Sequence, residues 1–209
     1  MKKTILTAAS ALLITGLSIA GEPGNGKTTY EVSTDKSKIT WKGEKVIGSH
    51  TGTLSLASGS ITFNNGELVA TKVTMDMTTI VNTDLEDPTY NQKLVGHLKS
   101  DDFFSVDKHP KATFEATNFK EIRGAKEGQD NYTVTGNLTI KGITHQITFP
   151  VRIAVKSGKL EAYGKVVFDR TKWNIRYGSG SFFDGLGDNM IYNDIELTFA
   201  LIAESKTIN

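Results

Sequence analysis

Apolar and polar side chains alternate at every second position through most of this chain, the pattern of β-strands that bury one face. Around Phe114, for example, Ala112 and Ala116 share one phase while Thr113 and Glu115 occupy the other. The alternation predicts about nine strands, and the chain is therefore expected to be all-β. The predicted strands are Ile39–Trp41, Leu54–Leu56, Ile61–Phe63, Val69–Met77, Ala112–Ala116, Val134–Ile140, Ile147–Val155, Leu160–Phe168 and Ile195–Leu201.

Short polar segments separate most of these strands. Asn64, Asn65 and Gly66 follow one strand, and Ser157 with Gly158 follows another. Such residues suit the tight turns of antiparallel hairpins. We therefore expect an antiparallel meander, which either stacks as a sandwich or closes into a barrel, and closure alone removes the unpaired edges.

Small residues on the buried phase bear on whether a barrel would be hollow. An eight-stranded barrel is just wide enough to hold one small ligand, so a lining trimmed towards Gly and Ala favours a cavity. Glycines also bend strands at barrel corners, and the pattern alone does not separate the two interpretations. The positions concerned are Gly52, Ala112, Ala116, Gly136, Ala162 and Gly164.

One segment departs from the β pattern. Tyr90, Leu94 and Leu98 recur every four residues, the spacing that lines one face of a short helix. Two adjacent phenylalanines follow, and Pro110 then forces the backbone into an extended path. A short helix between strands is therefore expected, in the position of a lid.

The N-terminus has the features of a secretory signal peptide. Lys2 and Lys3 precede an apolar run that ends in a small-x-small motif at Ala20. The run is shorter than the ~20 residues of a membrane span, so no transmembrane anchor is expected. We predict cleavage after Ala20, a flexible leader at residues 21–27, one domain at residues 28–206, and a periplasmic or secreted location.

Composition narrows the classes of partner. The 209 residues include no cysteine, so the exported chain would fold without disulfides. Loss of residues 1–20 removes two lysines and leaves 22 basic and 23 acidic side chains, a formal charge of about −1. This balance argues against nucleic acid as a partner and against electrostatic docking on an anionic membrane.

No motif for a metal, a cofactor or covalent catalysis stands out. The chain lacks a G-x-S-x-G elbow, and its four histidines have no metal-ligand spacing. No cofactor and no metal site are therefore expected. The histidines are His50, His97, His109 and His145.

Basic and aromatic side chains are densest in residues 168–177. A guanidinium binds phosphate through two hydrogen bonds and stacks on aromatic faces, which makes Arg170 the best candidate to receive a lipid head group. The alternative is a structural ion pair of Arg170 with Asp169 or Glu196 that closes the barrel end. The head-group candidates are Arg170, Lys172 and Arg176.

The glycine-rich segment Gly178–Gly187 does not match a dinucleotide-binding G-x-G-x-x-G, because Phe183 occupies the third glycine position. We predict a flexible hairpin connection there. An alternative is that Phe182 and Phe183 form an apolar lip over a cavity mouth.

Three segments carry a resemblance to a known family. They read HLKSDDFFSVDKHPKATF (His97–Phe114), LTIKGITHQITFPV (Leu138–Val151) and FDRTKWNIRYGS (Phe168–Ser179). Together they resemble the YceI-like family of lipocalin-like, polyisoprenoid-binding proteins, over about residues 28–203. Asn174, where the family usually carries Gly, and the glycine-rich insertion depart from it at one end of the molecule.

The resemblance implies a single antiparallel lipocalin-like β-barrel of about eight to nine strands with a short helix between strands. It implies that the interior binds a long-chain apolar lipid, a polyisoprenoid or a related isoprenoid or fatty-acyl molecule, for storage or transport, and it raises the possibility of a homodimer. The expected lipid-contacting residues are Trp41, Leu54, Phe63, Met75, Phe104, Phe114, Leu138, Phe149, Phe168 and Trp173.

Two other functions stay open beside this non-enzymatic carrier. One is a hydrolase or isomerase that uses His97 or His145 with a carboxylate inside the same cavity. The other is a stress-related interaction module whose barrel is filled by its own side chains. An apolar cavity would favour a lipid or small-molecule site over a filled barrel.

Overall fold

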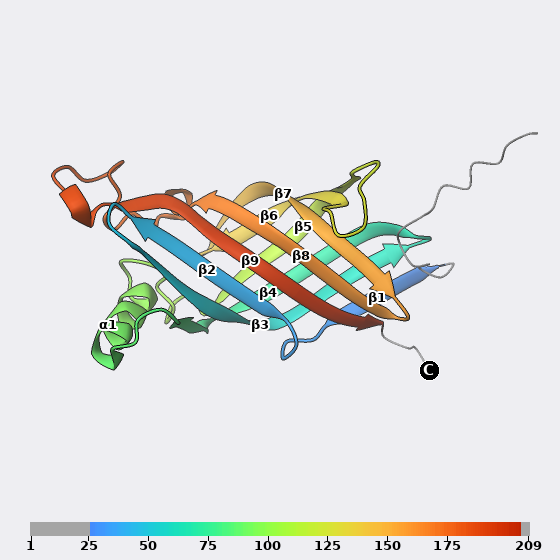
Figure 1. Ribbon diagram of the computed structural model, residues 1–209, viewed down its shortest axis with the longest axis horizontal. Helices are drawn as coiled ribbons and strands as arrows, with labels where there is room; N and C mark the ends of the chain where they lie inside the picture. The colour runs from blue at the N-terminus through green and yellow to red at the C-terminus, as the bar shows by residue number, and fades with distance from the viewer. Residues whose placement is uncertain (1–25, 206–209) are drawn as a thin grey trace, which may run out of the picture.

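Nine antiparallel strands form one sheet that closes on itself in the computed structural model, which describes residues 26–205 (Figure 1). One α-helix, α1 (Pro88–Lys99), and two 3₁₀ turns, η1 (Arg170–Trp173) and η2 (Gly187–Asn189), lie between strands. The strands are β1 (Lys27–Val32), β2 (Lys38–Lys45), β3 (Ser49–Asn64), β4 (Glu67–Asn82), β5 (Lys111–Glu121), β6 (Tyr132–Ile140), β7 (Ile143–Lys156), β8 (Lys159–Asp169) and β9 (Ile191–Ser205).

Eight of these strands, β2 to β9, make the closed barrel. Each pairs with the next along the chain, and β9 returns to pair with β2. The ninth strand, β1, also lies between β3 and β9 and pairs with the parts of these strands that β2 does not reach. Thr28 of β1 pairs with Phe63 of β3, and Glu31 pairs with Glu204 of β9. The predicted all-β meander barrel with a short helix is confirmed.

Three hairpins close with two-residue turns in which both residues have positive φ. These are Asn65–Gly66 (48° and 87°), Lys141–Gly142 (51° and 73°) and Ser157–Gly158 (51° and 74°). Such turns match the right-handed twist of the flanking strands. The tight hairpins expected at Gly66 and Gly158 therefore form and fix the register of β3 with β4 and of β7 with β8.

Two details of the predicted strands are wrong, although their number agrees. Leu54–Leu56 and Ile61–Phe63 belong to the single 16-residue strand β3, and β1 was not expected. β3 shifts register against β4 at three places, so the inward phase changes along the pair. For this reason Leu68 is buried, whereas Val69 is 46% exposed.

The small residues on the inward phase divide into two groups. A Cβ on Gly52, Gly136 or Gly164 would lie 2.4–2.5 Å from a ring atom of Trp41, Phe114 or Phe199 respectively. These glycines make room for aromatic rings on the neighbouring strands.

Two of the alanines in the same set, by contrast, lie beside empty space. Ala112 and Ala162 line the two cavities described below. The cavity interpretation therefore holds for these alanines, while the glycines serve ring packing.

Helix α1 lies at one end of the barrel, beside the end of β4 (Figure 1). The Asp87 carboxylate caps its N-terminus by accepting from the N–H groups of Thr89 and Tyr90. Leu94 and Leu98 pack against the core, while Tyr90 is 65% exposed. The predicted helix is confirmed, but its buried face excludes Tyr90.

The predicted signal peptide and most of the predicted leader lie outside the described residues. Across residues 26–205, no helix is both long enough and apolar enough to cross a membrane.

Candidate functional site

Two adjoining cavities occupy the barrel interior. The first, which we call the mouth chamber, has a volume of about 140 Å³ and lies at the α1 end. The second, the inner chamber, has a volume of about 90 Å³ and lies further along the barrel. Met75, Leu138 and Leu197 line both chambers and form the wall between them.

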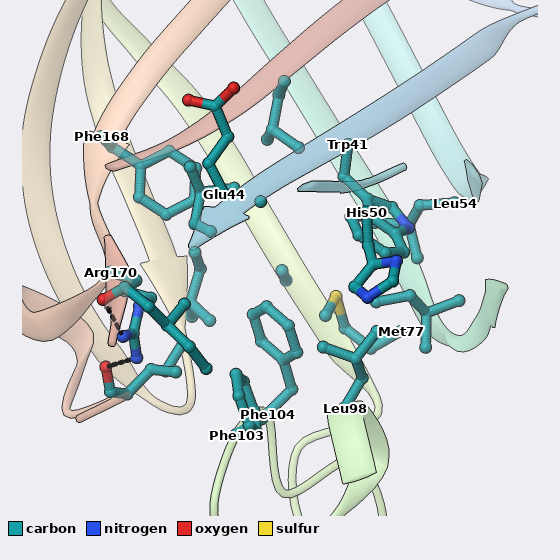
Figure 2. Close-up of a pocket in the computed structure, with 18 of the residues that line it drawn as sticks. Trp41, Glu44, His50, Leu54, Met77, Leu98, Phe103, Phe104, Phe168 and Arg170 are labelled. Atoms are coloured by element: carbon teal, nitrogen blue, oxygen red, sulfur yellow. Dashed lines mark hydrogen bonds between the residues drawn. The ribbon is translucent and has the colours of Figure 1, made fainter. Parts of the chain in front are cut away.

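The mouth chamber is built where α1 and the segment after it meet the barrel (Figure 2). Leu98 of α1 and the adjacent Phe103 and Phe104 project into it from one side, and Phe168 of β8 projects from another. The chamber reaches the surface near Glu44, which is exposed. The mouth chamber is therefore an apolar space with the charged Glu44 at its margin.

The inner chamber is lined almost entirely by apolar side chains. Thr71 is its single hydroxyl-bearing lining residue among residues 26–205. Ile195 and Leu197 in the mouth chamber, and Phe199 in the inner one, stay partly accessible because they face empty space as well as neighbours. The interior described here is therefore not filled by its own side chains.

Eight of the ten lipid-contacting residues expected from the family resemblance line these chambers. Phe63 and Trp173 line neither. Contact of the eight with a ligand stays a prediction. The mouth chamber contains Trp41, Leu54, Met75, Phe104, Leu138 and Phe168, and the inner chamber contains Met75, Phe114, Leu138 and Phe149.

Trp173 lies behind the cavity wall. Its side chain is 1% exposed, and its indole N–H donates to the Leu138 carbonyl at 3.1 Å. The ring packs edge-on against Phe168 at 5.1 Å between centroids. Asn174 follows with φ of 58°, in the left-handed region that Asn tolerates better than most residues, so its difference from the family's usual Gly preserves the turn.

Arg170 lines the mouth chamber and is 1% exposed. Its guanidinium donates to the carbonyls of Ile175 at 2.8 Å, Ile191 at 3.1 Å and Tyr192 at 3.1 Å, and Figure 2 shows it held at the chamber edge. Burial lowers the pKa of Arg170 below its ordinary value, and the charge of Asp169 opposes this shift.

The expected alternative, an ion pair of Arg170 with Asp169 or Glu196, does not form. Asp169 instead caps η1 through Thr171, and Glu196 pairs with Lys165. Within residues 26–205, Arg170 makes no ion pair within 4.0 Å. The hydrogen-bond partners of the buried cation are neutral carbonyls, and its guanidinium carbon lies 6.0 Å from the centre of the Phe103 ring.

The other two head-group candidates lie outside the chambers. Lys172 and Arg176 are both exposed, and the Arg176 guanidinium stacks over the Phe182 ring at 4.5 Å. The structure therefore brings only Arg170 of the three to the cavity.

A polar network that the sequence did not indicate borders the mouth chamber. The Nδ1 atom of His50 lies 2.8 Å from the Asp84 carboxylate, which also accepts from Thr51 N–H and Asn82 at 2.6 Å each. Burial acts to raise the pKa of Asp84, but these hydrogen bonds outweigh it and lower the pKa. The network ties the end of β4 to β3.

The two histidines considered for catalysis do not line either chamber. His97 pairs with Asp102 at 3.0 Å, with that carboxylate largely exposed, and His145 lies 3.0 Å from the Lys172 carbonyl. In residues 26–205 no group of three metal-binding side chains is present. A histidine and carboxylate pair inside the cavity, as the enzyme alternative requires, is not formed by His97 or His145.

Several chamber residues carried no distinguishing sequence signal. Most sit on period-two stripes or on the face of α1, and Phe103 and Ile175 lie in connections between elements, so only the three-dimensional arrangement separates them from packed core residues. They are Met77, Ile80, Leu94, Leu98, Phe103, Ile175, Ile191, Ile195 and Leu197 in the mouth chamber and Val134, Ile147, Val151, Ile153, Phe199 and Leu201 in the inner chamber.

The glycine-rich segment does not place an apolar lip over the cavity. Phe182 and Phe183 are 45% and 49% exposed and line neither chamber. Their N–H groups both donate to the Ser179 carbonyl. The segment is a hydrogen-bonded loop that holds two phenylalanines outwards.

Solved structures of other proteins contain a barrel with the same fold. The BcnA protein of Burkholderia cenocepacia superposes with a TM-score of 0.61 at 25% identity, covering 82% of this chain and 99% of that one. A polyisoprenoid binding domain from Saccharophagus degradans, implicated in plant cell wall breakdown, also gives 0.61, at 14% identity, covering 85% of this chain and 98% of that one. At such identity the second likeness concerns the fold.

Sequence comparison agrees with the fold. The protein YceI of Salmonella arizonae is 31% identical over 176 residues, which cover 79% of this chain and 84% of that protein. The model of the YceI-like domain matches residues 30–203. The chain therefore belongs to the YceI-like family.

Proposed function

We propose that the protein binds one long-chain apolar lipid inside the barrel, a polyisoprenoid or a related isoprenoid or fatty-acyl molecule, and stores or transports it in the periplasm or outside the cell. The observation that carries the proposal is the pair of apolar chambers sharing Met75, Leu138 and Leu197. The name of the Saccharophagus domain, which binds polyisoprenoid, supports this ligand class. The protein carries its ligand and does not react with it.

The charged residues at the margin of the mouth chamber give the ligand a direction. Arg170, Glu44, Lys45 and His50 all border the mouth chamber, whereas the inner chamber has no charged lining residue within residues 26–205. An amphiphile therefore places its tail in the inner chamber and its polar end at the mouth. Met75 in the shared wall suits this, because an unbranched thioether chain adapts to an irregular tail.

Burial of the tail supplies the driving force. At ~0.8 kcal/mol per buried CH₂, a long tail gains more by leaving water than any non-covalent affinity can express. The competitor for the ligand is therefore a membrane, where the tail is equally dry. A carrier therefore needs an affinity for the lipid that is close to that of the bilayer, so that the lipid can both enter and leave the barrel.

Arg170 favours a ligand with an anionic polar end. A guanidinium has five N–H donors, and three hydrogen bonds to carbonyls are formed here, so a charge without a counter-ion remains beside the cavity. We expect an acyl carboxylate or prenyl phosphate to bind at least about tenfold more tightly than the alcohol of equal chain length. Displacement of a fluorescent lipid measures both, and equal affinities would show that Arg170 has no role in head-group binding.

Filling the inner chamber tests the lipid site itself. Ala162 lines that chamber and is 3% exposed, so Ala162→Phe shortens the space for a tail. We expect at least about a tenfold loss of affinity for long-chain lipids and little change for short-chain analogues, because one added ring displaces several methylene groups worth ~0.8 kcal/mol each. Titration with an acyl chain-length series measures the effect.

The matched control is Ala154→Phe on the outer face of the neighbouring strand β7, where the side chain is exposed. It adds the same ring to the same barrel and is expected to bind every chain length as the unmodified protein does. Undiminished binding of long chains by a folded Ala162→Phe protein would place the tail elsewhere than the inner chamber.

A further inference from the structure

Exposed apolar side chains concentrate at the mouth end of the barrel. Six of the ten large apolar side chains that are exposed in residues 26–205 lie in the β2–β3 loop or between residues 177 and 192. Figure 1 shows these loops together at the end of the barrel that carries α1, away from the C-terminal end. We call this set the mouth rim, and its members are Val46, Ile47, Tyr177, Phe182, Phe183 and Tyr192.

Hydrogen bonds join the two loops of the mouth rim into one surface. Val46 N–H donates to the Met190 carbonyl at 3.0 Å, and Ile191 N–H donates to the Gly178 carbonyl at 2.8 Å. The Ser179 hydroxyl, in a residue 0% exposed, lies 2.7 Å from the Asn193 side-chain oxygen. The rim is thus a hydrogen-bonded surface whose apolar side chains are 40–62% exposed.

Clustered apolar exposure of this kind marks a surface that meets another apolar phase. The mouth chamber opens beside the rim, since it reaches the exposed Glu44 and includes Ile191, next to the rim residue Tyr192. A lipid that leaves a bilayer through the rim would enter the chamber without crossing water.

Charge on the rim indicates which bilayer surface fits. The β2–β3 loop and its flanks, together with residues 171–192, carry three basic and three acidic side chains: Lys45, Lys172, Arg176, Glu44, Asp184 and Asp188. A balanced surface gains nothing from anionic lipid, so the attraction comes from the aromatic and aliphatic side chains.

We propose that the mouth rim docks on the interfacial region of a lipid bilayer, independently of anionic lipid, and so places the mouth chamber against the membrane. The choice of a bilayer as partner rests on the proposed lipid ligand, while docking itself needs no bound ligand. Phe182 and Phe183 are the two adjacent aromatic rings of the rim, 45% and 49% exposed, and they supply its largest contact with the bilayer.

Vesicle flotation tests the proposal with processed protein recovered from an exporting host. We expect the protein to float with phosphatidylcholine vesicles, with less than a twofold change on adding phosphatidylglycerol or salt. Phe182→Ser with Phe183→Ser should reduce flotation at least tenfold. Val69→Ser, a 46% exposed position at the opposite end of the barrel, is the matched control and should float as the unmodified protein does.

Lipid transfer separates this proposal from the proposed function. The double Ser variant should take up a fluorescent acyl lipid added as monomers normally, yet extract it from vesicles at least fivefold more slowly. Failure of all forms to bind monomeric lipid would contradict the carrier function and leave docking to be decided by flotation. Docking is overturned if the unmodified protein does not float, if both variants lose flotation equally, or if sedimentation shows a dimer that the double variant dissociates.

Discussion

Replacing Arg170 by methionine is expected to lower the free energy of unfolding by about 3–5 kcal/mol. The guanidinium is 1% exposed and donates to three backbone carbonyls, which the substitution leaves without this donor in a space poor in water. At about 2–4 °C per kcal/mol for a chain of this size, the melting temperature falls by about 10 °C. Thermal and urea unfolding followed by circular dichroism measure the change.

Two companion variants separate geometry from charge. Arg170→Lys keeps the charge, but a single ammonium does not reproduce the planar fork that reaches three carbonyls, so most of the loss should remain. Lys172→Met removes an exposed positive charge two residues away and should change stability by less than about 0.5 kcal/mol. If Arg170→Met unfolded at the urea concentration of the unmodified protein, the stabilising role we assign to these hydrogen bonds would be wrong.

Truncating Trp173 to alanine is expected to cost about 3–5 kcal/mol, the range for loss of a large buried aromatic. The ring is 1% exposed and packs against Phe168 and His145, and its indole holds the Leu138 carbonyl. Because Leu138 lines both chambers, the variant should also bind lipid less tightly than the unmodified protein. Urea unfolding followed by circular dichroism is preferable to fluorescence, since Trp173 is one of two tryptophans.

The conservative variant and an exposed control sharpen this prediction. Trp173→Phe keeps most of the packing and loses one hydrogen bond, so its cost should be near 1–2 kcal/mol. Phe182→Ala removes an aromatic ring that is 45% exposed and should change stability by less than about 0.5 kcal/mol. If the Trp173→Ala protein were as stable as the Phe182→Ala protein, Trp173 would not support the cavity wall as we infer.

The architecture was largely predictable because a half-buried strand imposes a period of two on its side chains. The alternation around Phe114 and the Ser157–Gly158 turn led directly to an antiparallel meander, and both are found. The merging of two predicted strands into β3 was not predictable, since register shifts against β4 depend on pairing between distant residues. β1 escaped notice because only Tyr30 and Val32 of its six residues are buried, an alternation too short to predict a strand.

The candidate site was less predictable, for a different physical reason. Phe63 and Phe114 follow the same sequence pattern, yet Phe114 faces the inner chamber while Phe63 packs edge-on against Tyr30 of β1 at 6.0 Å. A stripe of inward positions does not reveal where packing leaves a void. The hydrogen-bond partners of Arg170 could not be predicted either, because every residue has a backbone carbonyl and the sequence does not show which of them, such as that of Ile175, lies near the guanidinium.

Native mass spectrometry of the processed protein, purified without detergent and followed by organic extraction, tests the central claim most directly. We predict one lipid per barrel, with a tail long enough to pass from the mouth chamber to the inner chamber and an anionic or strongly polar end. Identification of the extract would then name the ligand. A protein that is recovered bare and also fails to take up added prenyl or acyl lipids would contradict the claim that these chambers form a lipid site.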